Sequence, residues 1–189
     1  MFGKVLNFFY EKIKSKVFNY RAKRKNEILR EHGCLVGSDV SFGRNVTLSV
    51  SGEAGKVKIG DNVHIGTNSF IRGEGGLKVG NNVIISRNVV IYSTSHNYEG
   101  TRLPFDDTNL EKAVEIGDNV WIGVGVTIVP GTKIGEGAVI GMGACLHGEI
   151  PPLSVVGFNP PKIIKQRKYD RYEKLKNERS FCGADGEAL

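Results

Sequence analysis

The hydrophobic positions of this chain recur with a period of six residues. One run without interruption comprises Ile116, Ile122, Ile128, Ile134, Ile140 and Leu146. Three earlier groups keep the same phase: Val36, Phe42 and Leu48; Ile59, Ile65 and Ile71; Val79, Ile85 and Ile91. A helix repeats every 3.6 residues and a strand every two, so a period of six predicts a short strand followed by a corner.

Glycine and small residues complete the six-residue unit. Nine of the fifteen phased apolar residues are followed by glycine, and the fourth place after each usually holds a small or β-branched residue, as Val63 does after Ile59. We expect the bulky residue to point inward, the small one to fill the next inward position, and glycine to permit the backbone conformation of the turn. One such coil cannot bury its face alone, so the pattern predicts an all-β solenoid of stacked coils.

Breaks in the period locate the loops and the domain limits. Ile71 and Val79 are eight residues apart, which adds two residues to one coil, and Ile91 to Ile116 leaves an insertion at 97–114. Loops on a rigid scaffold commonly carry function. We therefore expect a terminal helix at 1–30 and a solenoid catalytic domain at 31–161 that carries this loop. A basic helix at 162–179 and a disordered tail at 180–189 should follow.

Charge separates the ends of the chain from its middle. The net charge is +6, but it is unevenly distributed along the chain. Residues 1–30 contain nine basic and two acidic residues, and residues 31–161 contain nine basic and thirteen acidic ones. Residues 162–179 contain eight basic and three acidic residues. An acidic main body argues against a nucleic-acid partner. Three cysteines without paired spacing favour a reducing, cytoplasmic location, and no apolar run is long enough to span a bilayer.

The N-terminal segment has an apolar stripe at helical spacing. It consists of Leu6, Phe9, Ile13, Val17 and Tyr20, with lysines and arginines between them. This pattern predicts a basic amphipathic helix. Two roles remain open: a cap on the open end of the solenoid, which we favour because every solenoid needs one, and peripheral membrane contact through residues 1–25.

The repeats at 33–166, and above all VEIGDNVWIGVGVTIVPGTKIGEGAVIGMGACLHGEIPPLSVVGFNPPKIIK at 114–165, resemble the hexapeptide-repeat acyltransferases. Within that family the chain is most similar to the maltose, galactoside and polysaccharide O-acetyltransferases. The resemblance implies a left-handed parallel β-helix and a homotrimer with active sites between neighbouring chains. It also implies acetyl-CoA as co-substrate, a sugar or glycan acceptor and no metal.

The resemblance also implies a catalytic role for His96. This residue ends the segment Ser93-Thr94-Ser95-His96 directly before the insertion, five places after the inward Ile91, so its side chain should point outward. The family has its catalytic histidine at the matching Ser-His step. Histidine suits a general base that takes a hydroxyl proton near neutral pH, and His96 would act on the acceptor hydroxyl directly.

Most of the predicted cofactor and acceptor residues are carried over from the family, whereas Trp121 is inferred from its outward position and Tyr92 from its aromatic ring. The predicted acetyl-CoA residues are Trp121, Val124, Met142, His147, Lys162 and Lys165. The amide of Val124 would stabilise the oxyanion, and the two lysines would meet the CoA phosphates. On the acceptor side, Arg72 and Glu74 stand where the family has an asparagine and an aspartate, and Tyr92 could stack on a sugar. Arg72 could meet an anionic acceptor or pair with Glu74.

Two other functions compete with sugar O-acetylation. An N-acetyltransferase of an amino sugar shares the fold, although such enzymes usually have an extra N-terminal nucleotide-binding domain. A γ-type carbonic anhydrase also shares the fold and needs three zinc-binding histidines. The chain has only four histidines, and His64 and His96 have no obvious third partner.

Overall fold

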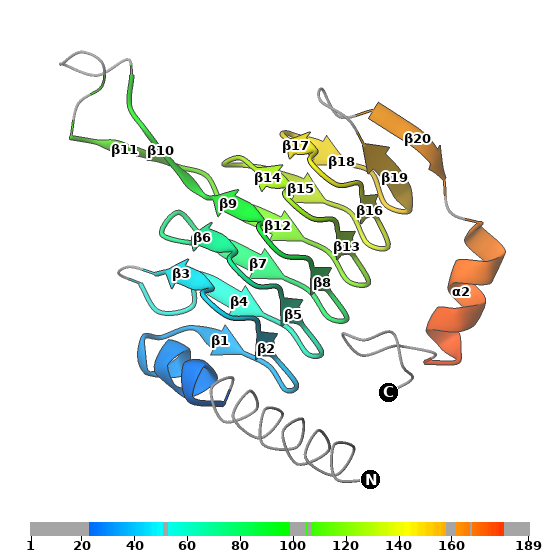
Figure 1. Cartoon of the computed structure of the whole chain (residues 1–189), viewed down its shortest axis with the longest axis horizontal. Coiled ribbons are helices and arrows are strands. Elements are labelled where there is room, and N and C mark those ends of the chain that lie inside the picture. The colour runs from blue at the N-terminus through cyan, green and yellow to red at the C-terminus, as the bar shows by residue number, and fades with distance from the viewer. Residues whose placement is uncertain are drawn as a thin grey trace, which may run out of the picture.

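The computed structural model describes residues 23–50, 53–98, 105, 107–157, 162–166 and 168–179. Its core is a parallel β-helix whose coils stack along one axis (Figure 1). The apolar stripe predicted at 6–20 and the tail 180–189 lie outside the described residues. Of the helices in the described part of the chain, none has the length and apolarity needed to cross a bilayer.

Three sheets form the walls of the β-helix, and every strand pairing in them is parallel except the last one in sheet B. Sheet A contains β1 (Leu35–Val36), β4 (Val57–Ile59), β7 (Leu77–Val79), β12 (Val114–Ile116), β15 (Lys133–Ile134) and β18 (Glu149–Ile150). Sheet B contains β2 (Ser41–Phe42), β5 (His64–Ile65), β8 (Ile84–Ile85), β13 (Trp121–Ile122), β16 (Val139–Ile140), β19 (Ser154–Gly157) and β20 (Lys162–Gln166). Sheet C contains β3 (Thr47–Ser49), β6 (Phe70–Arg72), β9 (Val90–Tyr92), β14 (Thr127–Ile128) and β17 (Cys145–Leu146).

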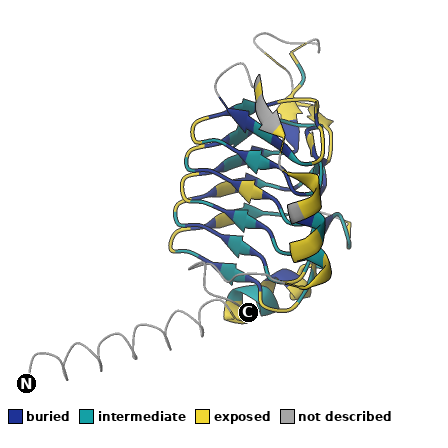
Figure 2. Ribbon diagram, turned by 90° about the vertical axis from the view of Figure 1, so that its right-hand side faces the viewer, coloured by how far each residue is buried: buried dark blue, intermediate teal, exposed yellow. Residues whose placement is uncertain are grey.

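The six-residue period is confirmed as the inward period of the coils. Thirteen of the fifteen phased residues are buried, and the other two, Val36 and Leu48, are partly buried in the first coil. The stacking is in register, so that Ile59 pairs with Val79 and Val79 with Ile116. Figure 2 shows the buried positions recurring from coil to coil along the stack. One continuous apolar column therefore holds the coils together.

The glycines after the inward residues serve a different purpose from the predicted one. Positive φ angles lie two residues later, for example at Asn62 (53°) and Asn68 (59°), and not at Gly60 or Gly66. A Cβ atom on Gly66 would stand 2.5 Å from the carbonyl carbon of Ser86 in the next coil. The expectation that glycine supplies the turn conformation is therefore wrong for these positions. Glycine is needed there because adjacent coils approach too closely for a side chain.

A ladder of asparagines runs along the corner between sheets A and B. Asn62 Nδ2 donates to Asn82 Oδ1 (3.0 Å), and Asn82 Nδ2 donates to Asn119 Oδ1 (3.1 Å). Asn119 Nδ2 then donates to the hydroxyl of Tyr172 (3.0 Å), which itself donates to Glu136 Oε1 (2.9 Å). Tyr172 belongs to helix α2 (Tyr169–Asn177), so the ladder fixes this helix against the corner.

A helical segment at 23–31 closes the N-terminal end of the solenoid. In later coils the carbonyls of Ile59, Val63 and Ser69 accept bonds from the coil before them. The matching carbonyls of the first coil belong to Val36, Val40 and Val46, and no coil precedes them. Side chains of the helical segment take its place: Arg30 donates to Val36, Asn26 to Val40 and Lys25 to Val46. The capping role is thus confirmed for this part of the N-terminal segment.

The C-terminal segment is only partly helical. A basic helix is expected over 162–179, but residues 162–166 form β20, which pairs antiparallel with β19. The helix is limited to Tyr169–Asn177. The physical reason is the open edge of sheet B after β19, which offers unpaired backbone groups to the β-branched Ile163-Ile164 pair.

We predict that Gly66→Ala destabilises the fold through the contact with Ser86. Overpacking of this kind costs about 1–3 kcal/mol of unfolding free energy, measurable by chemical denaturation. Gly143→Asn is the matched control, because Gly143 has a φ of 69° with no atom within 4 Å of the place that a Cβ would take, and asparagine tolerates that φ. Equal stability of the two variants would contradict the coil-contact explanation.

We predict that the attachment of α2 weakens in acid. Burial by itself raises the pKa of Glu136, but hydrogen bonds from Lys176, Tyr172 and Asn119 lower it overall. A lowered folded-state pKa contributes stability at neutral pH that is lost as the pH falls through that pKa. The difference in unfolding midpoint between the wild type and Glu136→Gln should therefore shrink as the pH falls below about 4.5, toward the lowered pKa of the folded state. A difference that does not change with pH would refute this account.

Candidate active site

The insertion forms an arm that projects from the stack of coils. Strand β10 (Thr94–His96) pairs antiparallel with β11 (Asn109–Glu111), with His96 opposite Asn109 (Figure 1). The base of the arm is tied to the coil below, because Ser93 Oγ donates to the carbonyl of Arg72 (2.8 Å) and accepts from the Gly75 amide (2.9 Å). His96 therefore lies on a paired strand and not in an irregular loop.

The side chain of His96 is exposed, as the sequence predicts. Its imidazole stacks on the ring of Phe105, with centroids 4.0 Å apart and planes 7° apart. Its ring nitrogens make no hydrogen bond with any residue that the structure describes. The ring is thus held by a stacking contact on one face while its nitrogens remain open to an incoming hydroxyl.

Three predicted acceptor residues lie together at the base of the arm. Arg72 Nε and Glu74 Oε1 form an ion pair (3.2 Å), and the Arg72 guanidinium lies 5.6 Å from the ring centre of Tyr92. Tyr92 also packs against Phe70, with ring centroids 5.9 Å apart. Of the two roles open for Arg72, the structure shows pairing with Glu74.

Glu74 has one oxygen that is buried and lacks a partner. Its Oε2 has no hydrogen-bond partner among the described residues, and the side chain is only 15% exposed. A buried acceptor without a donor is costly, so this oxygen is suited to a ligand hydroxyl or N–H. Together the ion pair and Tyr92 offer a hydrogen-bond acceptor, a donor and an aromatic face to a polar ligand.

Three predicted cofactor residues gather at a different corner, between sheets B and C. Trp121 on β13 is 55% exposed, and its Nε1 lies 3.4 Å from Ser86 Oγ. Val124 occupies the following turn, and its carbonyl accepts from the amide of Gly143, next to Met142 (76% exposed). The Val124 N–H has no hydrogen-bond partner among the described residues, nor has that of Met142. Both amides can therefore donate to a ligand.

The remaining predicted cofactor residues lie elsewhere. His147 follows β17 and is exposed at the corner between sheets C and A, away from Trp121. Lys162 and Lys165 lie on β20, opposite Gly157 and Val155, and their side chains are not described. One chain thus does not bring His96 and the Trp121 corner together, because they belong to different corners of the prism.

The outward side chains differ sharply between the three faces. Sheet B presents Ser41, His64, Ile84, Trp121, Val139 and Val155. Sheet C presents Thr47, Phe70, Val90, Thr127 and Cys145, with Ser49, Arg72 and Tyr92 at the end of its longer strands. Sheet A presents Leu35, Lys58, Lys78, Glu115, Lys133 and Glu149. Two faces of the prism are largely apolar and the third is largely charged.

Two contacts were not predicted from the sequence. Ser41 Oγ lies 2.9 Å from His64 Nδ1, and burial lowers the pKa of His64. Both residues directly precede a phased inward residue, Phe42 or Ile65, so their neighbouring outward positions could have been found from the coil alignment. The stacking of Phe105 on His96 could not have been found in this way, because the insertion that contains Phe105 does not follow the six-residue period.

No cluster of three or more possible metal ligands occurs in the described part of the chain.

Two family models match the repeats. The bacterial transferase hexapeptide (six repeats) matches residues 113–148, and the hexapeptide repeat of succinyl-transferase matches residues 56–93. Among solved structures, a maltose O-acetyltransferase from Clostridium difficile is 30% identical, with a TM-score of 0.58 over 84% of this chain and 85% of that one. An N-acyltransferase from Bacillus cereus, solved with dTDP and coenzyme A, is 24% identical with a TM-score of 0.61 over 81% and 94% of the two chains. These similarities confirm the left-handed parallel β-helix.

The curated relatives are acetyltransferases by name. A probable acetyltransferase of Mycobacterium tuberculosis is 32% identical over 68% of this chain, and the chain spans 50% of its length. The chain likewise spans 56% of a putative acetyltransferase of Saccharomyces cerevisiae. A putative lipopolysaccharide biosynthesis O-acetyl transferase of Escherichia coli is 33% identical over 75% of this chain and 79% of the relative. On this similarity and the matching repeats, the chain belongs to the hexapeptide-repeat acyltransferase family.

Proposed function

We propose that this protein transfers an acetyl group from acetyl-CoA to a hydroxyl of a sugar or glycan, with His96 as general base. The main support for this proposal is the exposed imidazole of His96, which lies on a strand-paired arm with its ring nitrogens open. The chain that presents this imidazole is a member of an acyltransferase family. Relatives named as O-acetyltransferases, including one named for lipopolysaccharide biosynthesis, support a glycan acceptor.

Direct transfer needs only one proton carrier. His96 takes the proton of the acceptor hydroxyl while the hydroxyl oxygen attacks the carbonyl carbon of the thioester. The π electrons of that carbonyl group move to its oxygen. The free amide of Val124 donates to this oxyanion. When the tetrahedral intermediate collapses, the C–S bond breaks and the thiolate of CoA takes the proton from His96. The products are an acetyl ester and CoA, and no cysteine or serine nucleophile is used.

The apolar faces of the prism support a homotrimer. Burying sheets B and C against neighbouring copies would remove the exposed Trp121 and Phe70 from water and leave the charged sheet A outside. Such an arrangement would place the arm of one chain against the Trp121 corner of the next. The active site would then combine His96 of one copy with Trp121, Val124 and Met142 of another.

Acetyl-CoA would occupy the groove between two copies, with Trp121 and Met142 along its pantetheine arm. The family pattern assigns the phosphates of CoA to Lys162 and Lys165, and assigns a further cofactor contact to His147.

The described cysteines Cys34 and Cys145 are unpaired, which is consistent with a reducing cytoplasm, where we place the reaction. A screen with sugar and amino-sugar acceptors separates O-acetylation from N-acylation, which the Bacillus cereus structure represents.

We predict that His96→Ala lowers kcat by about 10²–10⁴-fold, because the general base is lost. The dissociation constant for CoA should not change, since His96 does not lie among the predicted CoA residues. Acetyl-CoA consumption with a sugar acceptor measures kcat, and calorimetry measures the dissociation constant for CoA. His32→Asn is the control, because His32 bonds the Ile28 carbonyl within the N-terminal cap. Wild-type turnover in His96→Ala would refute the proposal.

We predict that two impaired variants restore activity when they share a trimer. His96→Ala and Trp121→Ala chains, mixed after reversible dissociation, should give trimers in which one of three interfaces has an intact His96 and an intact Trp121. Activity should rise above that of either variant alone, toward about a quarter of the wild-type value for a random 1:1 mixture, because about a quarter of the trimers then contain one variant only. A mixture no more active than its two components would place the whole site within a single chain.

A further inference from the structure

Phe105 is an exposed aromatic residue that does not belong to the hydrophobic core. It lies on the insertion between β10 and β11, is 43% exposed, and takes no part in the apolar column of the solenoid. Its ring stacks on His96, with ring centroids 4.0 Å apart. Packing of the solenoid therefore does not account for a phenylalanine at this place.

The segment that carries Phe105 is tied at both ends directly beside His96. The amide of Asn97 donates to the carbonyl of Thr108 (3.2 Å), and Asn97 Nδ2 donates to Thr108 Oγ1 (3.1 Å). Asn97 follows His96, and Thr108 precedes its cross-strand partner Asn109, so these bonds extend the β10–β11 pairing past His96. The backbone of His96 is thus held on both sides, and the freedom that remains lies in its side-chain torsions.

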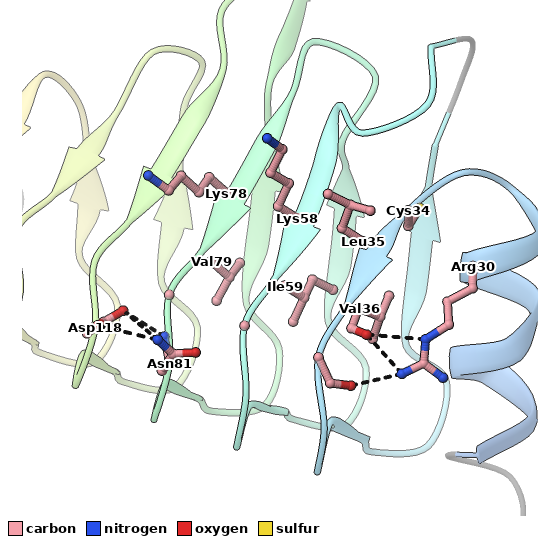
Figure 3. A pocket seen from close by; sticks show the side chains of 13 residues that line it. Arg30, Cys34, Leu35, Val36, Lys58, Ile59, Lys78, Val79, Asn81 and Asp118 are labelled. Carbon is pink, nitrogen blue, oxygen red and sulfur yellow. Dashed lines mark hydrogen bonds between the residues drawn. The ribbon is translucent and has the colours of Figure 1, made fainter.

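Hydrogen bonds fix many of the polar side chains on the outside of the prism. Figure 3 shows two of them beside sheet A, where Asp118 Oδ1 accepts from the amide of Asn81 (2.8 Å) and the Arg30 guanidinium donates to the carbonyl of Val36 (2.9 Å). Each such bond occupies a donor or an acceptor of the side chain that it fixes. A general base cannot be fixed in this way at the nitrogen that must take the proton.

The ring of His96 is oriented differently from two other histidine rings. His32 Nδ1 lies 2.8 Å from the carbonyl oxygen of Ile28, and His64 Nδ1 lies 2.9 Å from Ser41 Oγ. His96 has an aromatic contact instead, with the two ring planes 7° apart. The terminal torsion of a histidine is broad, so a parallel ring against one face restricts it. Both nitrogens lie in the ring plane, and the stack leaves them open.

The stack also favours the form of His96 that arises during the reaction. The ring becomes an imidazolium cation when it takes the proton, and an aromatic face attracts a cation within about 6 Å of its centroid. This charge is absent before proton transfer, so the attraction is stronger in the transition state than in the ground state. Interactions of that kind raise kcat and have little effect on KM.

We propose that Phe105 is a positioning residue for His96, whose ring orients the imidazole and stabilises its protonated form. The inference rests on the proposed role of His96 as general base. Phe105 exchanges no proton itself and acts through His96 alone.

Kinetics of the full chain, with acetyl-CoA and the best acceptor from the sugar screen, test this role. Phe105→Leu keeps an apolar side chain but removes the ring. It should lower kcat about five-fold and change the KM for acetyl-CoA less than about two-fold. Phe105→Tyr keeps the stack and should retain the wild-type kcat. Phe105→Leu added to His96→Ala should cause no further loss, because the two residues act as a unit.

Leu110→Ala is the matched control on the same arm. Leu110 is 42% exposed on β11, and it lies opposite Ser95, one residue from the His96–Asn109 pair. Successive side chains of a strand point to opposite faces, so Leu110 lies on the other face of the arm from His96. Its replacement should leave kcat within about two-fold of the wild-type value.

An NMR measurement separates this inference from the proposed reaction, because it requires no turnover. The ring current of Phe105 displaces the ring-proton signals of His96, so Phe105→Leu should shift these signals and leave those of His32 and His64 in place. Unchanged His96 signals, an unchanged or higher kcat in Phe105→Leu, or an equal loss in Leu110→Ala would overturn the inference. Wild-type turnover in His96→Ala would instead overturn the proposed function, with the stack still visible in the spectrum.

Discussion

Close stacking of the backbone on three faces at once is the constraint on which the rest of this structure depends. Each coil must lie one strand spacing from the next in every sheet, so each corner must bring two chain segments almost into contact. Glycine at positions such as Gly66 removes the side chain that would prevent this, and asparagines with positive φ turn the chain two residues later. The inward isoleucines then form one column, because a shift in register would move these glycines and asparagines away from the corners where they are needed.

The same constraint determines where chemistry can occur. The interior of the prism is filled by apolar side chains, so polar groups can act only at outward positions, at corners or on insertions. His96 and the Trp121 corner occupy two such places that one rigid chain keeps apart. In the proposed reaction, an arm that extends beyond the prism would reach a site between two copies, and Arg72, Glu74 and Tyr92 at its base would give the acceptor side a polar surface.

Features that obey the six-residue period could be predicted from the sequence, and those that depend on the irregular segments could not. The period identifies the buried residues and the outward directions of Trp121 and His96, because direction repeats with each coil. It does not identify the β10–β11 pairing or the Phe105 stack, since the insertion has no repeat. Strand β20 was missed because its partner is a sheet edge that exists only once the solenoid has folded, and the charges of 162–179 favour a helix locally.

The N-terminal cap also has a consequence for solubility. The carbonyls of the first coil point along the axis and, left open, would offer a template to the terminal strands of another molecule. Prisms could then add end to end and grow into filaments, as sheets with open edges do. Lys25, Asn26 and Arg30 occupy those acceptors with three side chains from one short helix, while β20 covers the last strand of sheet B at the other end. The protein thus limits its own length at the two places where a repeating structure would otherwise continue.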